Sequence, residues 1–322
     1  MAVKNNLVQK TQAQPQTRLG ITGYLNRVDV ANNIEQALGS VNKQRFITSV
    51  ISAVNTNPTL QECTNKSIFS GALLGESLNL SPSPQLGHYY LVPFNDKNEG
   101  KVAQFQMGYK GYIQLAIRSG QYKKLNVLAI KKGELEYFDP LNEEIRINLM
   151  IDKWDEREEA ETIGYYAMFE LTNGFRKAIY WSKKQMITHA DKYSPAFSKD
   201  SCTIKTKKGD TITKVSFEDF EKGNYLPNDA WLYSSFWYKN FDGMAYKTML
   251  RQLISKWGIM SIDLQKAFEK DMTFEDEKGN VNFGESDNVI DMESLSELVP
   301  LEKTEDSETS NENDVQQALF GN

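Results

Sequence analysis

The chain has 322 residues, 40% of them hydrophobic, and a net charge of −6 at pH 7. This is enough for one large domain or two small ones with a sizeable core. No stretch approaches the 18–20 or so apolar residues that span a membrane, and the polar N-terminus does not resemble a signal peptide. Two cysteines far apart in sequence, Cys63 and Cys202, exclude a disulfide framework and suit a reducing compartment. We therefore expect a soluble, cytoplasmic protein.

The N-terminal part is predicted to be helical after a polar start. Residues 1–20 are rich in Gln and Asn and are expected to be disordered. Apolar residues at helical spacing then predict helices over about 26–39, 43–55 and 64–78, with Thr64 as the N-cap of the third.

The middle of the chain alternates apolar and polar residues, which predicts antiparallel strands. Asn173-Gly174 separates two such runs and favours a hairpin with a type I′ turn. The expected elements are strands over 88–94 and 102–107, a helix over 112–119 ended by Gly120, strands over 125–130, 145–149, 162–171 and 175–181, and a helix that Ser182 and Gln185 start as a capping box.

The last third combines a basic hairpin, a long helix and an acidic tail. Residues 203–215 alternate around Gly209-Asp210 and contain Lys205, Lys207 and Lys208; they predict a basic hairpin, either a mobile arm or an ordinary solvated hairpin. A helix is expected over about 235–256. From 264 onward the chain carries sixteen acidic residues against four lysines, a net of −12, so residues 1–263 carry +6. We expect the tail to be disordered, ending in a short apolar DVQQALF segment at 314–320.

Residues 101–132 form the most informative window, because they include seven cations and no Asp or Glu. Uncompensated like charge is unfavourable unless an anion such as phosphate neutralises it, and aromatic rings among cations suit stacked bases. The alternative is a basic sheet face balanced by acidic residues elsewhere in the fold. The cations are Lys101, Lys110, Arg118, Lys123, Lys124, Lys131 and Lys132, and the tyrosines in or beside the window are Tyr90, Tyr109, Tyr112 and Tyr122.

The expected helix over 235–256 predicts a second row of cations. Lys239, Lys247 and Arg251 fall within about 120° of one another on a helical wheel, with no acidic residue between them on that face. Met244, Leu250 and Leu253 belong to an apolar stripe that faces the core. We predict that Lys247 and Arg251 contact phosphates, with a merely solvated face as the alternative.

Two runs carry a family resemblance: GYKGYIQLAIRSGQY at 108–122 and MAYKTMLRQLISKWGIMS at 244–261. Together they resemble the RecT family of phage and prophage single-strand annealing recombinases, over roughly residues 20–263. The resemblance implies binding of single-stranded DNA without ATP, pairing of complementary strands, oligomers on the nucleic acid, and DNA contacts from the helix that holds Lys247.

Within GYKGY, the residue types suit a ligand site. Gly108 and Gly111 allow a backbone to approach a ligand closely, Lys110 can contact phosphate, and Tyr109 or Tyr112 can stack. The alternatives are that Tyr112 belongs to the core and that Arg118 satisfies terminal helix carbonyls.

Enzyme motifs are missing from the sequence. It has no phosphate-binding loop and no dinucleotide fingerprint, and His88 and His189 have no partner at metal-ligand spacing. The acidic run at 152–161 leaves a metal-dependent nuclease using Asp152 and Asp155 as one alternative, although consecutive charges favour a solvated loop. A protein-interaction module acting through the acidic tail is the other alternative.

We therefore predict an α+β fold in which helices pack on a twisted antiparallel sheet. The expected organisation is a disordered segment over 1–20, one DNA-binding core over 21–263 and an acidic disordered tail over 264–322. The expected function is single-strand annealing in recombination, with no catalytic residue, metal or cofactor. Expected partners are single-stranded DNA, the annealed duplex, further copies in a ring or filament, and an exonuclease or host single-strand-binding protein. The predicted DNA-binding residues are Lys101, Tyr109, Lys110, Tyr112, Arg118, Lys123, Lys124, Lys239, Lys247 and Arg251.

Overall fold

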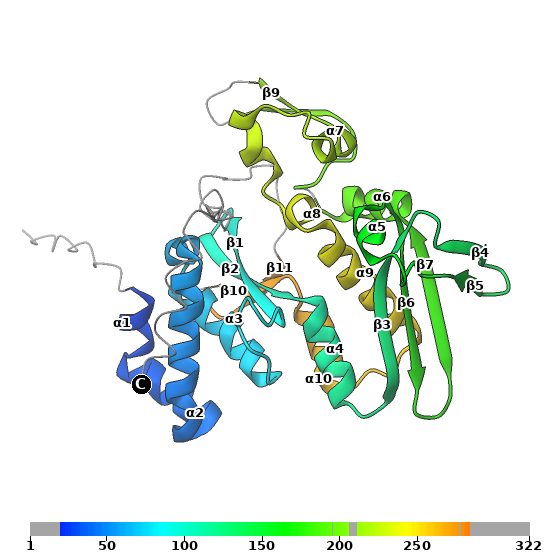
Figure 1. Cartoon of the computed structure of the whole chain (residues 1–322). Coiled ribbons are helices and arrows are strands. Elements are labelled where there is room, and N and C mark those ends of the chain that lie inside the picture. Colours follow the sequence, from blue (N-terminus) through cyan, green and yellow to red (C-terminus); the bar gives the residue numbers. More distant parts are fainter. Residues whose placement is uncertain (1–19, 195, 206–210, 277, 284–322) are drawn as a thin grey trace, which may run out of the picture.

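The computed structural model describes residues 20–194, 196–205, 211–276 and 278–283. Its N-terminal helices carry apolar residues toward a first sheet (Figure 1). The elements are α1 (Ile21–Leu25), α2 (Val28–Thr56), the 3₁₀ helix η1 (Pro58–Glu62) and α3 (Asn65–Ser77). The side chain of Thr64 accepts a hydrogen bond from the Ser67 amide, which confirms the predicted cap. The two helices expected over 26–55 are joined as α2 with a kink at Gly39, whose φ is +77°.

The first sheet combines a predicted hairpin with strands from the end of the chain. Strands β1 (Tyr89–Asp96) and β2 (Gly100–Met107) pair antiparallel, which confirms that hairpin. Strand β10 (Thr273–Glu275) pairs with β2 and with β11 (Val281–Phe283), giving the order β1-β2-β10-β11. Helix α10 (Ile262–Lys270) precedes β10.

These C-terminal elements correct the predicted boundary at 263. Leu264 and Ala267 are fully buried, and Phe274 is nearly so. Disorder was predicted after residue 263 because acidic residues are dense there. That composition concealed a short amphipathic helix and two short strands. The folded part therefore extends at least to residue 283.

The second sheet contains the basic window. Helix α4 (Tyr109–Arg118) leads into β3 (Tyr122–Lys131), which pairs with β6 (Thr162–Leu171), and β6 pairs with β7 (Arg176–Ser182). Helix α6 (Lys183–Tyr193) begins with the predicted capping box of Ser182 and Gln185. The β6–β7 hairpin is confirmed, but its turn is not type I′, because Gly174 has a positive φ and Asn173 does not. The strands of the described chain are thus divided among separate antiparallel sheets rather than joined in one.

Smaller elements project from these layers (Figure 1). They are the hairpin β4 (Leu135–Asp139) with β5 (Glu144–Ile147), helix α5 (Trp154–Glu159), the hairpin β8 (Cys202–Lys205) with β9 (Thr211–Lys214), α7 (Phe217–Glu221) and the 3₁₀ helix η2 (Pro227–Tyr233). The 203–215 hairpin is present, while Lys207, Lys208 and the Gly209-Asp210 turn lie outside the described residues. The acidic tail beyond 283, with the 314–320 segment, also lies outside them.

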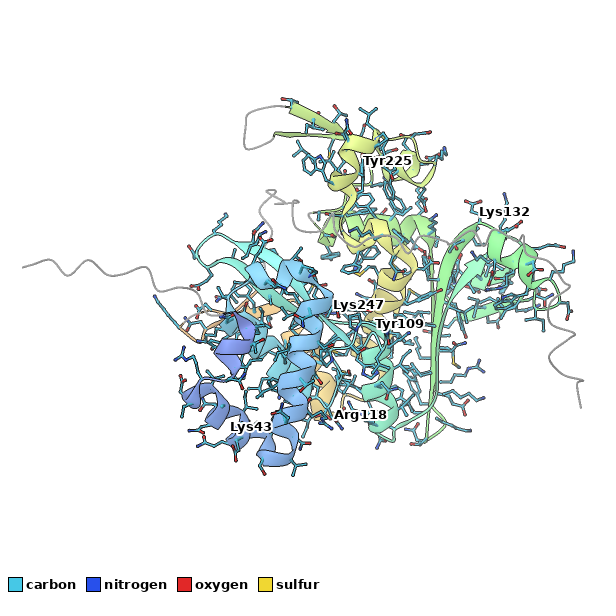
Figure 2. The ribbon with its side chains drawn as sticks, turned by 60° about the vertical axis from the view of Figure 1, so that its left-hand side comes forward. Lys43, Tyr109, Arg118, Lys132, Tyr225 and Lys247 are labelled. Atoms are coloured by element: carbon cyan, nitrogen blue, oxygen red, sulfur yellow. The ribbon has the colours of Figure 1, made fainter. Side chains whose placement is uncertain are left out.

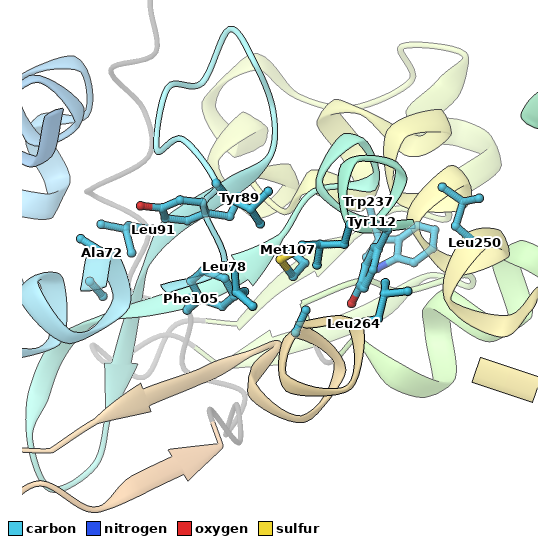
Figure 3. Packing of buried hydrophobic residues seen from close by; sticks show 14 of the residues in the cluster. Ala72, Leu78, Tyr89, Leu91, Phe105, Met107, Tyr112, Trp237, Leu250 and Leu264 are labelled. Atoms are coloured by element: carbon cyan, nitrogen blue, oxygen red, sulfur yellow. The ribbon is translucent and has the colours of Figure 1, made fainter. Parts of the chain in front are cut away.

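Helices α8 (Phe236–Lys239) and α9 (Phe241–Trp257) connect the two sheets. Helix α9 packs on β3, β6 and β7 and against α4. The hydroxyl of Tyr165 on β6 donates to the carboxylate of Asp242 at 2.6 Å, which fixes the N-terminal end of α9 on the second sheet. One cluster of buried residues runs from α3, β1 and β2 through Met107 and Tyr112 to Leu250 and Leu264 (Figure 3). Among the described residues, no helix is long and apolar enough to cross a membrane.

Candidate nucleic-acid interface

A pocket lies where the first sheet meets α8 and α9. The end of β2 and the start of α4 form one side, and α8 with the first turns of α9 forms the other. Tyr109 of α4 and Lys247 of α9 both line the pocket and lie near each other in Figure 2. The lining residues are Tyr90, Gln106, Met107, Gly108, Tyr109, Phe236, Asn240, Gly243, Met244 and Lys247.

The GYKGY glycines let α4 start close to the preceding chain. A Cβ at Gly108 would overlap the Gly87 carbonyl oxygen, and a Cβ at Gly111 would overlap that of His88. The Gly108 amide donates to the His88 carbonyl at 2.9 Å. The expected close approach is therefore to the protein's own backbone, and it fixes where the tyrosines of α4 point.

The two tyrosines of the motif have different surroundings. Tyr109 is half-buried, forms part of the pocket wall and makes an edge contact with Tyr246 at 5.5 Å between ring centroids. Tyr112 is fully buried and donates from its hydroxyl to Asp271 at 3.0 Å. Burial, together with the Asp271 carboxylate, raises the pKa of Tyr112 well above its usual value. The predicted stacking role of Tyr112 is thus wrong, because its ring cannot reach a ligand, and the core alternative holds.

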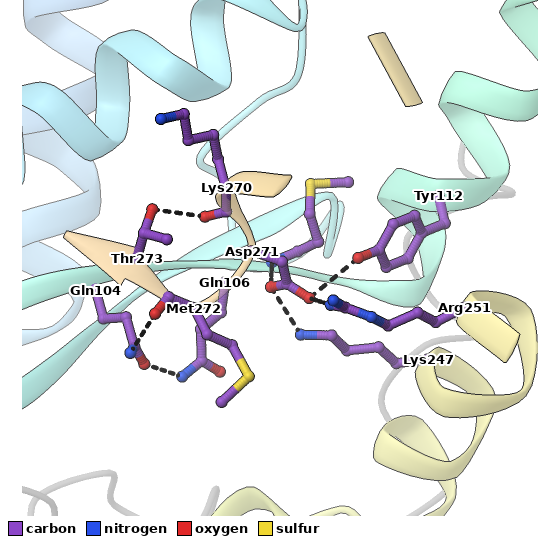
Figure 4. Close-up of polar contacts among 10 residues, drawn as sticks. Gln104, Gln106, Tyr112, Lys247, Arg251, Lys270, Asp271, Met272 and Thr273 are labelled. Carbon is purple, nitrogen blue, oxygen red and sulfur yellow. Dashed lines mark hydrogen bonds and ion pairs between the residues drawn. The ribbon is translucent and has the colours of Figure 1, made fainter. Parts of the chain in front are cut away.

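Asp271 lies at the centre of a buried polar network (Figure 4). Its side chain is fully buried. One carboxylate oxygen accepts from the Met107 amide at 2.9 Å and from Lys247 Nζ at 3.0 Å. The other accepts from Tyr112 and from Arg251 Nη1 at 2.6 Å. The charge of Lys247 is therefore compensated inside the protein.

This network changes the interpretation of the predicted phosphate contacts. Lys247 is only 8% exposed and lies on the pocket floor, so it does not belong to an outward basic row. Arg251 is partly exposed, at 38% of its side chain, but is held by Asp271 and lies over the Phe268 ring. Both side chains have a structural role that the helical wheel did not predict.

The predicted single helix over 235–256 is interrupted. Asn240 has φ −150° and ψ 67°, which ends α8, and its side chain accepts from the Gly243 amide as the N-cap of α9. Lys239 therefore lies on a different helix from Lys247, and the three cations do not form one row. Lys239 remains at the surface, with a pKa lowered by partial burial.

Several cations of the 101–132 window have acidic partners from other segments. Lys101 pairs with Glu62, and Lys132 lies 4.0 Å from Glu161. Lys123 and Lys124 share the carboxylate of Glu170, at 2.6 and 3.3 Å, and lower its pKa. The alternative of a basic face balanced by distant acidic residues is confirmed for these pairs. Because two lysines share one carboxylate, the exposed pair on β3 keeps a net positive charge.

Lys110 and Arg118 both belong to α4, but their surroundings differ. Lys110 is exposed beside the loop that ends at Gly87. Arg118 donates to the carbonyls of Leu78 and Asn79 at 2.6 and 3.2 Å, just after α3, which confirms the alternative of terminal carbonyls. Burial, with Arg118 and Lys110 nearby, lowers the pKa of His88.

The acidic run at 152–161 is partly helical. It contains α5, and Asp152 and Asp155 are exposed there. Arg157 from this helix donates to the buried carboxylate of Glu134 at 2.6 Å. Within the part of the chain that the structure describes, no group of three or more His, Cys, Asp or Glu side chains could hold a metal ion.

Sequence reasoning missed Asp271 and part of the pocket wall. Phe236, Gln106 and Asn240 line the pocket but carry no motif. Asp271 stood in a segment predicted to be disordered, and its partners are 20–164 residues away in sequence. For these missed pocket residues, the one local signal was that Phe236, an aromatic residue, directly follows the capping Ser235.

A family model and two known proteins match most of this chain. The family model of the RecT family matches residues 44–283, which include β1, β2, α4, α8, α9 and β10. An uncharacterized protein YqaK of Bacillus subtilis is 35% identical over 91% of this chain and 87% of its own length. Protein RecT of Escherichia coli is 26% identical over 78% of this chain and 80% of its own length. Since the family model covers well over half of the sequence, this chain belongs to the RecT family.

Proposed function

We propose that this protein binds single-stranded DNA and anneals complementary strands without ATP, as part of recombination. The observation that carries the proposal is the RecT family match over 44–283, because it spans every element that borders the pocket. The exposed cations near these elements support it. They include Lys110 on α4, Lys239 on α8, and Lys123 with Lys124 on β3.

The proposed interface uses exposed cations for the phosphates. Lys123 and Lys124 can exchange their shared Glu170 for phosphate at low cost, because exposed ion pairs contribute little to stability. Lys110 and Lys239 stand nearer to the pocket and would hold neighbouring phosphates. Contacts of this kind are independent of base sequence. Lys101, Arg118, Lys247 and Arg251 would support these side chains through their contacts within the protein.

The proposed mechanism needs no covalent step. One strand is held by its phosphates while copies of the protein align along it as a ring or filament. A complementary strand then pairs with it, with about 1.4 kcal/mol per base-pair step as the driving force. An exonuclease or a host single-strand-binding protein would supply or present the strand.

The direct test is annealing of two labelled complementary oligonucleotides in the absence of ATP. Binding of a dT oligonucleotide should weaken with salt, with a log–log slope of about −0.7 per phosphate contacted. A flat salt dependence would remove the electrostatic interface. Shortening of the strands when magnesium is added would favour the nuclease alternative instead.

Substitutions of the exposed lysines test where the phosphate contacts lie. Lys110→Gln and the pair Lys123→Gln with Lys124→Gln should each reduce the slope by about 0.7 per contact removed. Lys43→Gln is a matched control, because Lys43 lies on α2 away from the pocket and is paired with Glu35 at 2.8 Å (Figure 2). The proposed contacts are wrong if the control and the test variants change the slope alike.

A further inference from the structure

We propose that the pocket between β1, α4 and α8 takes one nucleobase of the bound single strand in each subunit. This inference rests on the proposed function and gives the pocket a ligand different from phosphate. The strand would lie with its phosphates on the outer cations and turn one base inward. Three features of the pocket carry the proposal: its aromatic wall, the pairing of its lysine with Asp271 and its amide groups.

The aromatic wall comes from segments far apart in sequence. Tyr90 of β1 and Phe236 of α8 have ring centroids 6.0 Å apart with planes inclined by 35°. Tyr109 adds a third ring to the same pocket. Phe236 is 36% exposed, which leaves ring surface available to a ligand. Every base has a π-face, so stacking on such rings does not depend on sequence.

The floor of the pocket offers phosphate no unpaired cation among the described residues. Among the described residues that line the pocket, Lys247 is the only cation, and its ammonium is paired with the fully buried Asp271 carboxylate. Asp271 also pairs with Arg251, so the network carries one net positive charge, but a phosphate in the pocket would have to compete with this buried carboxylate for Lys247. A neutral, flat base instead meets Met244, whose polarizable thioether packs well against aromatic systems.

Two side-chain amides also line the pocket. Gln106 donates from Nε2 to Gln104 at 2.7 Å, and Asn240 accepts at Oδ1 from Gly243 at 3.0 Å. In the described part of the chain this leaves Gln106 Oε1 as an acceptor and Asn240 Nδ2 as a donor without a protein partner. An acceptor and a donor beside an aromatic wall match the edge of a base and offer phosphate little. The pocket therefore fits a base held by stacking, with its edge toward the two amides.

A base in this pocket would affect annealing directly. Stacking on Tyr90 and Phe236 competes with stacking between neighbouring bases, so the strand would be kept unstacked at one position in each subunit. An unstacked strand leaves its other bases accessible to the complementary strand.

The test compares two oligonucleotides of equal charge and length: dT and a fully abasic deoxyribose-phosphate chain. The full-length protein should bind dT more tightly than the abasic chain. Phe236→Ala should weaken dT binding by about fivefold to a hundredfold, the range typical of one stacked base, and leave abasic binding and the salt slope unchanged. Phe138→Ala is the matched control, because Phe138 is 39% exposed on β4, outside the pocket.

The possible outcomes distinguish failure of the base-pocket proposal from failure of the proposed function. Equal weakening of dT and abasic binding by Phe236→Ala, or no change in either, overturns the base pocket. If Phe236→Ala loses its circular dichroism signal, Phe236→Leu replaces it, since leucine keeps apolar volume without a ring; the same selective loss is expected. Equal binding of both oligonucleotides by the unmodified protein also overturns the pocket but leaves the proposed function intact. Binding of neither would refute the proposed function, and the pocket with it.

Discussion

At the residue scale, Asp271 decides what two of the most conspicuous cations do. Lys247 and Arg251 lie one turn apart on α9 without an acidic residue between them, which on sequence grounds suits phosphate. Their partner is instead a carboxylate placed by β10. A buried carboxylate needs such partners, because an uncompensated charge in the interior is strongly unfavourable.

Replacing both Lys247 and Arg251 with Gln should therefore destabilise the fold, contrary to the expectation for solvated residues. We expect the free energy of unfolding to fall by about 3–5 kcal/mol, the range for breaking a buried pair. Urea unfolding followed by circular dichroism measures this. Arg45→Gln removes the surface pair with Glu76 and should cost about 1 kcal/mol or less. A loss for the double variant no greater than that control would contradict the structural role of the network.

Lys214 is a second buried cation, and its environment predicts a pH effect. It is 2% exposed, donates to the Ala196 carbonyl at 2.9 Å and lies over the Tyr238 ring. Burial lowers the pKa of Lys214 from its ordinary 10.5 to about 8, a shift that nearby Cys202 partly opposes. Below pH 8 the amine is protonated in both the folded and the unfolded chain, and the folded state carries the full cost of burying the charge.

Between pH 8 and 10.5 the unfolded chain keeps a proton that the folded chain has lost. This cost is relieved as the pH rises, so the contribution of Lys214 to stability increases by up to about 1.4 kcal/mol per pH unit. Lys214→Met should remove this increase, which unfolding curves at pH 7.5 to 9.5 or so will show. The tyrosines titrate in both proteins, so subtracting the variant's free energy of unfolding from that of the unmodified protein at each pH removes their contribution. Parallel pH profiles would mean that Lys214 keeps an ordinary pKa.

At the scale of elements, the C-terminal helix and strands complete the site. Helix α10 buries Leu264 and Ala267, and β10 pairs with β2 and brings Asp271 to α4 and α9. The segment 262–283 therefore supports the pocket floor although it does not line the pocket.

Truncation after residue 263 should consequently unfold the protein, whereas truncation after 283 should not. The shorter chain loses the partner of Lys247 and Arg251 and the buried Leu264, a combined loss of about 5 kcal/mol or more, comparable with the whole stability of many domains. Circular dichroism and solubility of the two truncated chains provide the measurement. Cooperative unfolding of the 1–263 chain at the temperature of the full chain would show that α10 and β10 are dispensable.

At the scale of the whole molecule, charge is distributed unevenly along the chain. Residues 284–322 contain eleven acidic residues and one lysine, a net of −10. Because this segment directly follows β11 in the chain, we expect its negative charge to compete with DNA for the exposed cations.

Deleting residues 284–322 should tighten binding of a dT oligonucleotide by about threefold or more at roughly 10 mM salt, where the Debye length is about 30 Å. The difference should disappear near 0.15 M salt, where it is about 8 Å. Fluorescence anisotropy titrations of both chains at the two salt concentrations test this, and annealing itself should survive the deletion. An affinity gain that does not depend on salt would contradict electrostatic competition by this segment.

The sequence by itself determined the features that depend on short-range chemistry. The Thr64 cap, the Ser182 and Gln185 capping box, and the β1–β2 and β6–β7 hairpins follow from residues within a few positions of one another. The two motifs likewise identified the family. Only the tertiary structure decided which motif residues are buried and which line the pocket: it buried Tyr112 and Lys247 against Asp271, ended α8 at Asn240, and joined Tyr90 to Phe236. Burial and charge compensation are set by partners far away in sequence, and no local pattern encodes them.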